Sequence, residues 1–142
     1  MPLQKEMRNG WKANMARFVV DAYAWIEYLE GSEKGKKVSI LIENELNDVF
    51  TSSSTVAEIV SKFLRSKKNI KIALNCIDSM STVVNVNREI GSLAGQIHFE
   101  AKKKIKDFGM LDAFVAATAR SVNANILTGD PHFRNFKEAV MI

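Results

Sequence analysis

The stretch GMLDAFVAATARSVNANILTGDPHF, residues 109–133, contains a complete helix-to-strand transition with an acidic residue near each end. Residues 110–122 have the apolar spacing of an amphipathic helix, and residues 125–127 form a short apolar run typical of a buried strand. Asp112 stands in the first turn of the expected helix, and Asp130 follows the expected strand. A helix that leads directly into a buried strand is the repeating unit of an α/β protein.

The rest of the chain alternates in the same way. Strands separated by helices require crossover connections, which produce a parallel sheet covered on both faces. We therefore expect an α/β fold, a three-layer α/β/α domain with a central parallel sheet, over residues 15–142. The expected strands are residues 17–20, 49–52, 82–86, 125–127 and 139–142, and the main helices are residues 22–30, 34–46, 56–64, 69–79, 87–104 and 110–122.

Residues 1–14 have no periodic apolar pattern. We expect them to form an N-terminal extension, either flexible or a partner-binding arm anchored by Trp11. The whole chain of 142 residues is long enough for one domain with a substantial core.

Composition narrows the class of protein. The chain is 46% hydrophobic and 25% charged, as in ordinary globular proteins, and no apolar run approaches the roughly 20 residues that a membrane-spanning helix needs. No signal peptide is evident at the N-terminus. The single cysteine, Cys76, excludes an internal disulfide, so a reducing, cytoplasmic location is expected. The net charge of +4 weakly favours an anionic partner.

Four acidic residues are expected to meet at one edge of the sheet. Asp21 directly follows the first strand, Glu58 lies in the first turn of the helix after the second, and Asp130 follows the fourth. Asp112 opens a crossover helix, which runs antiparallel to the strands, so its N-terminus lies at the edge where the strands end. Sites in open parallel sheets form at this carboxyl edge.

Four carboxylates in one cleft repel one another and stay ionised together only with cations between them. Hard oxygen ligands suit Mg²⁺ or Mn²⁺, and a water on such an ion can attack a phosphodiester. Asp21, Glu58, Asp112 and Asp130 are therefore candidate metal ligands and catalytic residues.

Each acid also has a structural interpretation. Asp21 could cap the helix that follows it, and Asp130 before Pro131 fits a cap followed by proline at the first helical position. Asp112 could be a simple first-turn charge. Taken singly, each acid is better explained in this way, but capping alone does not explain why all four converge.

Glu58 is the least certain member of the set. Thr55 and Glu58 fit a capping box, and Glu58 lies opposite the apolar stripe of its own helix. His132, two residues after Asp130, is a weak candidate for contact with metal or substrate, because two histidines in the chain do not make a cluster. Tyr23 and Trp25 are interpreted as packing residues rather than as platforms for base stacking.

The chain resembles the PIN domain family, most closely the small VapC-type toxins. Three segments carry the resemblance: FVVDAYAWIEYL with the first aspartate, TSSSTVAEIVSKFL with the glutamate, and residues 109–133 with the last two acids. The run LDAFVAATA followed by LTGDPHF is the most specific part. The resemblance extends over about residues 16–136.

This resemblance implies a PIN fold in which the acidic quartet falls on Asp21, Glu58, Asp112 and Asp130. It implies Mg²⁺- or Mn²⁺-dependent endonucleolytic cleavage of RNA, a homodimer, and inhibition by a cognate antitoxin protein. Thr128 matches the family's auxiliary hydroxyl beside the site. The chain departs from many relatives at Ala22, where they have serine or threonine.

A run of lysines shortly before Asp112 is a candidate for phosphate contacts that position the RNA without reading its sequence. The alternative is a solvated helix end. The run consists of Lys102, Lys103, Lys104 and Lys106.

Three interpretations of function follow. The first is the toxin ribonuclease of a VapBC-type toxin–antitoxin system. The second is an RNA-processing PIN nuclease outside such a system, and the third is a non-catalytic PIN-like scaffold that binds RNA or protein. The sequence does not specify the RNA target, the antitoxin or the number of metals bound.

Overall fold

The computed structural model describes residues 15–142, so the expectations for residues 1–14 and for Trp11 lie outside the described residues. Five parallel strands form one sheet in the order β3-β2-β1-β4-β5. No helix among the described residues is long and apolar enough to cross a membrane. The expectation of an α/β fold with a central parallel sheet is confirmed.

The helices and strands follow one another closely along the chain. They are β1 (Arg17–Val20), α2 (Ala22–Glu30), α3 (Glu33–Ile42), β2 (Asp48–Ser52), α4 (Ser53–Arg65), α5 (Ile70–Met80), β3 (Thr82–Val84), α6 (Arg88–Lys102), α7 (Met110–Ser121), β4 (Asn125–Thr128), the 3₁₀ helix η2 (Pro131–Phe133) and β5 (Ala139–Met141).

Two helix boundaries differ by three residues or more from those expected. The helix expected over residues 34–46 ends at Ile42. Helix α4 begins directly after β2, with Ser52 as its N-cap. Thr55 therefore lies inside the helix, and the expected capping box between Thr55 and Glu58 is wrong. The apolar periodicity from residue 56 onward could not reveal this earlier start, because the first turn of α4 is made of small polar residues.

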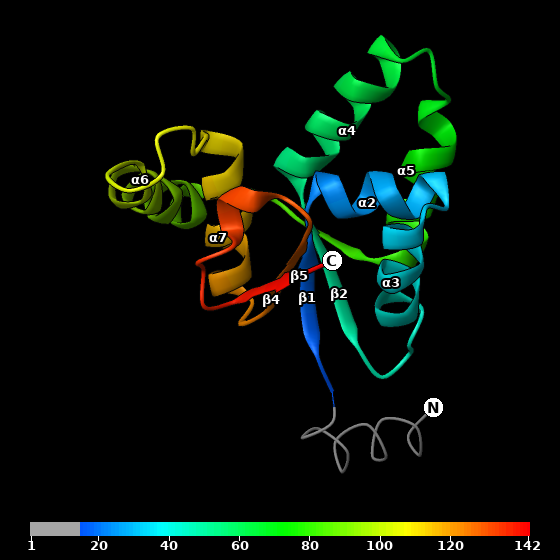
Figure 1. Ribbon diagram of the computed structural model, residues 1–142, viewed down its shortest axis with the longest axis horizontal. Coiled ribbons are helices and arrows are strands. Elements are labelled where there is room, and N and C mark those ends of the chain that lie inside the picture. Colours follow the sequence, from blue (N-terminus) through cyan, green and yellow to red (C-terminus); the bar gives the residue numbers. More distant parts are fainter. Residues whose placement is uncertain (1–14) are drawn as a thin grey trace.

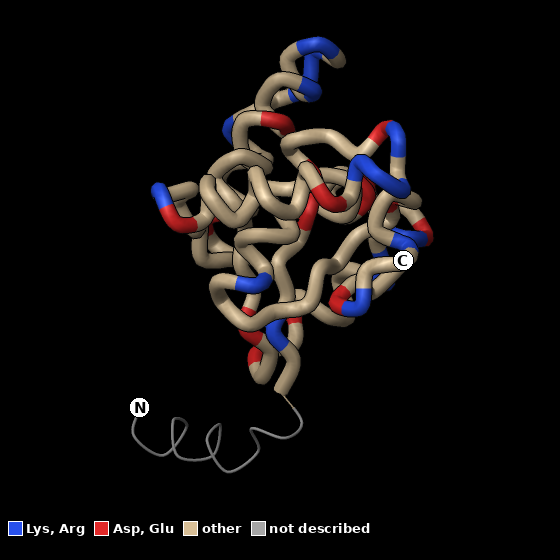
Figure 2. Tube along the Cα trace, turned by 90° about the vertical axis from the view of Figure 1, so that its left-hand side faces the viewer, with Lys and Arg blue, Asp and Glu red and all other residues tan. Residues whose placement is uncertain are grey.

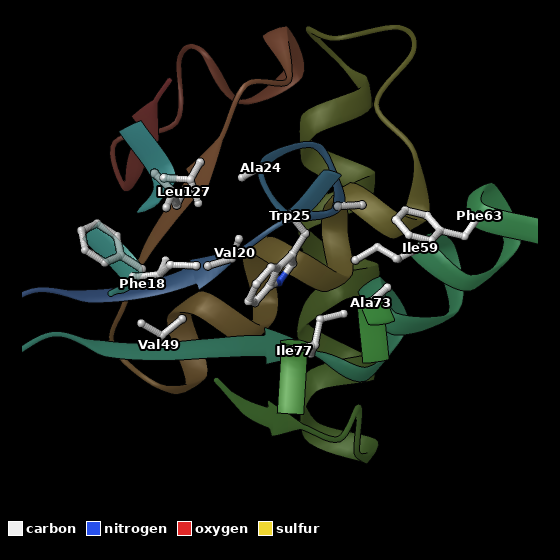
Figure 3. Packing of buried hydrophobic residues seen from close by; sticks show 13 residues of the cluster. Phe18, Val20, Ala24, Trp25, Val49, Ile59, Phe63, Ala73, Ile77 and Leu127 are labelled. Carbon is white, nitrogen blue, oxygen red and sulfur yellow. The ribbon is translucent and has the colours of Figure 1, made fainter. Parts of the chain in front are cut away.

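Helices cover both faces of the sheet. Alternate side chains of β1 point to opposite faces, as expected for a strand: Phe18 and Val20 pack under α2 to α5, whereas Val19 packs against α6 and α7. Figure 1 shows these two groups of helices on either side of the strands. The fully buried Trp25 of α2 donates its indole N–H to Thr51 of β2, and Figure 3 shows its ring among the other buried residues of this cluster. Trp25 is therefore a packing residue, as the sequence indicated.

Strand β1 lies at the point where the chain changes direction across the sheet. It pairs with β2 on one side and with β4 on the other, and the chain builds β2 and β3 before it crosses to β4 and β5. In Figure 1, α2 and α4 begin where β1 and β2 end. Ligands of open α/β sheets bind outside the carboxyl ends of the strands at such a switch point.

Helix α7 is buried differently from the stripe predicted for residues 110–122. Leu111, one of the apolar residues of this helix, is 43% exposed. Small residues, including Ala113, Ala116 and Ala117, are fully buried instead. These alanines allow α7 to pack closely between the sheet and α6, which brings the first turn of α7 to the carboxyl edge.

Candidate active site

Asp21 is the buried acid of this edge. It follows β1 and caps α2, because its Oδ1 accepts the backbone N–H of Ala24 at 2.9 Å. Its Oδ2 accepts the hydroxyl of Thr128 from the neighbouring strand β4. The side chain is thus held from two elements, and the residue is only 5% exposed. Asp21 therefore does cap α2, and this interaction orients its carboxylate toward the switch point.

Burial raises the pKa of Asp21 to about 7. Hydrogen bonds from Thr128 and Ala24 oppose this shift, while the negative charges of Asp130 and Glu58 add to it. The raised pKa means that the site disfavours the ionised carboxylate of Asp21 unless a cation enters. Asp21, Asp130 and Glu58 therefore interact electrostatically across three different elements.

Thr128, at the end of β4, links Asp21 to Asp130. Its Oγ1, while donating to Asp21, accepts the backbone N–H of Asp130 at 2.9 Å. Gly129 between them lies against the ring of Tyr23, where an added Cβ would come within 2.2 Å of a ring carbon. A side chain at this position would displace the Tyr23 ring or the turn, so close packing favours glycine here.

Asp130 caps η2, and its Oδ1 accepts the backbone N–H of His132 at 2.9 Å. Pro131 occupies the first position of η2, as the sequence predicted. Phe133 is fully buried against Phe108 and anchors this short helix to the core. His132, between Pro131 and Phe133, is thereby directed toward the start of α7.

Asp112 meets His132 at that point. Its Oδ2 accepts the backbone N–H of Gly109 at 3.0 Å and lies 3.1 Å from Nδ1 of His132. Burial raises the pKa of Asp112 and the charge of Asp130 adds to the shift, while the contacts with Gly109 and His132 lower it. Ligand atoms of Asp112, Asp130 and His132 lie within 4.8 Å of one another.

Glu58 occupies the periphery of the site. It is close enough to raise the pKa of Asp21, but its carboxylate forms an ion pair with Lys62 at 3.1 Å on the next turn of α4. Neither Glu58 nor Asp21 is among the three residues whose ligand atoms lie within 4.8 Å of one another.

The residues present fit a divalent cation. Within residues 15–142, no lysine or arginine forms an ion pair with Asp21, Asp112 or Asp130. Carboxylate oxygens and an imidazole nitrogen suit ions such as Mn²⁺, and carboxylates alone suit Mg²⁺. The donor set is thus negatively charged and lacks a protein cation to balance it.

A family profile described as PIN domain matches residues 18–139, which is most of the chain. The chain belongs to the PIN domain family. The match includes all four candidate acids and Thr128, and it agrees with the parallel sheet described above. No curated protein matches the chain.

Solved structures support the PIN fold. A toxin of Mycobacterium tuberculosis, VapC20, described as cleaving the sarcin–ricin loop, is 18% identical with a TM-score of 0.70 over 89% of this chain and 98% of its own. A chain of VapBC2 from Rickettsia felis, bound to promoter DNA, is 18% identical with a TM-score of 0.69 over 89% and 97%. A chain of DNA-bound VapBC from Salmonella typhimurium is 19% identical with a TM-score of 0.64 over 90% and 98%.

The lysine run of this PIN domain ends α6 and continues into the loop before α7, so it precedes the turn that carries Asp112. All four lysines are exposed. Lys103 pairs with Glu100 at 3.1 Å and lies over the ring of Phe99, which leaves it less available to a ligand. Figure 2 shows basic residues on several parts of the PIN domain, so the run is one basic site among several.

His132 is the residue that sequence reasoning undervalued. Its only signal was its place two residues after Asp130, and no periodicity marks a residue in a three-residue helix. The other histidine, His98 on α6, lies against Phe108 and is partly buried.

Proposed function

We propose that this PIN domain is a Mg²⁺- or Mn²⁺-dependent endoribonuclease and the toxin of a VapBC-type toxin–antitoxin system. The observation that carries the nuclease proposal is the set of acids at the switch point. Asp21 is buried beside Asp130 and Glu58, and Asp112 and Asp130 converge with His132. A cation is the missing partner of this arrangement.

Asp112 and Asp130 would hold the cation together with Asp21, and Glu58 would complete the acidic set. When bound, such an ion activates a water and neutralises charge on the phosphate and the leaving oxygen. The protein itself orients the ligands of this ion. Backbone N–H groups of Ala24, Gly109 and His132 orient the three aspartates, so the ligand atoms need little reorganisation.

Thr128 would keep the Asp21 carboxylate aimed at the site. Its hydroxyl donates to Asp21 and thereby stabilises the ionised form against the effect of burial. We assign Thr128 a positioning role, since its Oγ1 is already engaged by Asp21 and by the backbone of Asp130. Ala22, where many relatives have a hydroxyl, is buried and offers no replacement.

An RNA cleavage assay with Mg²⁺, Mn²⁺ or EDTA tests the nuclease proposal. The purified chain should cut single-stranded RNA with either metal and not with EDTA. Asp21→Asn and Asp112→Asn should each lower the rate by at least about a hundredfold, because each removes a charge needed at the metal. Asp78→Asn on the exposed surface of α5 is the matched control and should cut normally.

Two results would overturn the nuclease proposal. One is cleavage by Asp112→Asn at the wild-type rate in Mg²⁺. The other is no cleavage by the folded wild-type chain with either metal, together with RNA binding that needs no metal. The second result would favour the non-catalytic scaffold.

The toxin role needs a separate test, because it rests on similarity to structures that contain VapBC complexes. Expression of the chain in a bacterial host should arrest growth, and Asp112→Asn should abolish the arrest. Co-expression of a small DNA-binding protein encoded next to it should restore growth and yield a co-purifying complex. Cleavage in vitro without growth arrest would favour an RNA-processing nuclease.

A further inference from the structure

His132 is not a member of the acidic quartet, yet its imidazole lies beside two of the four acids, Asp112 and Asp130. Its Nδ1 is 3.1 Å from Oδ2 of Asp112 and 3.4 Å from Oδ1 of Asp130. These three residues come from two separate elements, the first turn of α7 and the η2 turn after β4. Nothing about a capping or packing role requires the imidazole to face two carboxylates at once.

The two oxygens that face Nδ1 are already fixed by the backbone. Oδ2 of Asp112 accepts the N–H of Gly109, and Oδ1 of Asp130 accepts the N–H of His132 itself. Each oxygen keeps a second lone pair. A neutral imidazole has a single N–H and can donate it well to only one of the two carboxylates.

The separations also suit a common ligand. Neighbouring ligands of an octahedral ion bound at roughly 2.1 Å are roughly 3 Å apart. The two distances from Nδ1 are close to that value. Since the ligand atoms of all three residues lie within 4.8 Å of one another, a cation at this point would need only an adjustment of the side chains to accept a lone pair from each.

The position of His132 is enforced by packing. Phe133 is fully buried against Phe108 and Phe136, and Pro131 fixes the start of η2. The imidazole also lies against Phe108, with ring centroids 6.5 Å apart. Packing of η2 against the core thus holds His132 beside the acids. Moving its side chain into solvent would lose the contact with Phe108.

We propose that His132 is a nitrogen ligand of the catalytic cation, through Nδ1, together with Asp112 and Asp130. This inference rests on the proposed metal-dependent function and specifies its ligand set. Imidazole is a better ligand for Mn²⁺ and the later first-row metals than for Mg²⁺, which prefers oxygen ligands. The site is accordingly a Mn²⁺-preferring one, and His132 provides the preference.

Electron spin echo spectroscopy of bound Mn²⁺ tests this directly, because it detects a nitrogen bonded to the ion. The chain contains two histidines, so His98 provides a matched control. Protein labelled with ¹⁵N-histidine should show a ¹⁵N coupling in the wild type and in His98→Ala. His132→Ala and His132→Gln should both lose it, and the glutamine variant preserves the size of the side chain.

Calorimetry gives the second measurement. His132→Ala should weaken Mn²⁺ binding by about tenfold or more and Mg²⁺ binding by less than about threefold, so that the selectivity ratio falls. His98→Ala should change neither. Circular dichroism of both variants checks that the fold is intact.

The outcomes separate this inference from the proposed function. If Mn²⁺ binds and Asp112→Asn abolishes binding, but no nitrogen coupling is seen and His132→Ala binds normally, His132 only donates a hydrogen bond to Asp112. That result overturns the inference and leaves the nuclease proposal standing. If neither metal binds the wild-type chain, both fail.

Discussion

The hydroxyl of Thr128 donates a hydrogen bond to the Asp21 carboxylate across 107 residues of sequence. Asp21 follows β1 and Thr128 ends β4, and these two strands pair in the centre of the sheet. The bond therefore joins the two strand ends on either side of the switch point. It also links Asp21 to Asp130, whose backbone N–H binds the same oxygen of Thr128.

Thr128→Val should show whether Thr128 positions the Asp21 carboxylate or only fills space between the strands. Valine keeps the shape but leaves Oδ2 of Asp21 without its donor and the N–H of Asp130 without an acceptor. We expect a loss of about 1–3 kcal/mol in unfolding free energy and a weaker Mn²⁺ affinity, measured by denaturant unfolding and calorimetry. Thr128→Ser retains the hydroxyl and should recover most of both. Equal behaviour of the two variants would argue against positioning.

The metal-free protein should lose stability as the pH rises from about 4 to about 7. Asp21 has a pKa of about 7 in the folded protein, against an ordinary value of 3.8, so in this window the folded carboxyl keeps a proton that the unfolded chain has released. The loss should be on the order of 4 kcal/mol at most, since one pKa unit corresponds to about 1.4 kcal/mol.

Thermal and denaturant unfolding of Asp21→Asn with EDTA isolates this effect. The variant cannot ionise here, so the difference in stability between the variant and the wild type should grow in favour of the variant as the pH rises. Mn²⁺ at pH 8 should stabilise the wild type by binding only its folded state. A difference that does not change with pH would contradict the prediction.

Gly129→Ala should destabilise the turn that carries Asp130. The new methyl group would meet the ring of Tyr23, and relieving such overpacking costs about 1–3 kcal/mol. The double variant with Tyr23→Ala should recover part of this loss, because the clashing ring is gone. Denaturant unfolding of both single variants and the double variant measures the coupling. If the stability losses of the two single variants simply add in the double variant, Tyr23 is not the reason for glycine at position 129.

The exposed lysines before α7 should contribute to RNA affinity through charge alone. Replacing Lys102, Lys104 and Lys106 with glutamine should weaken RNA binding and reduce its salt dependence, by a slope of about 0.7 for each phosphate that the variant no longer neutralises. Binding measured by fluorescence anisotropy at several salt concentrations checks this.

Two controls accompany the lysine variant. Lys103→Gln should have a smaller effect than any other single change in the run, because Lys103 is paired with Glu100. Exposed Lys34, Lys36 and Lys37 on α3, across the sheet, provide a variant that also removes three charges and should bind normally. If the α3 variant weakens binding equally, the run has no special part in it.

The features of this protein that depend on neighbouring residues could be predicted from the sequence. Apolar periodicity located the strands and α-helices to within a few residues, and their alternation led to the parallel sheet. The helix caps at Asp21 and Asp130 could also be predicted from the sequence, because each is a hydrogen bond to a residue two or three positions away. The same reasoning misplaced the start of α4, where polar residues hide the first turn.

Only the tertiary structure decided which groups meet at the carboxyl edge. Two residues joined by a single hydrogen bond need have no shared pattern in sequence, so the bond between Thr128 and Asp21 required the pairing of β1 with β4. In the same way, His132 became a candidate ligand because Phe133 is buried and turns the neighbouring imidazole toward Asp112 on α7. Periodicity tells which side of an element is buried, but distances between atoms of separate elements follow from how those elements pack.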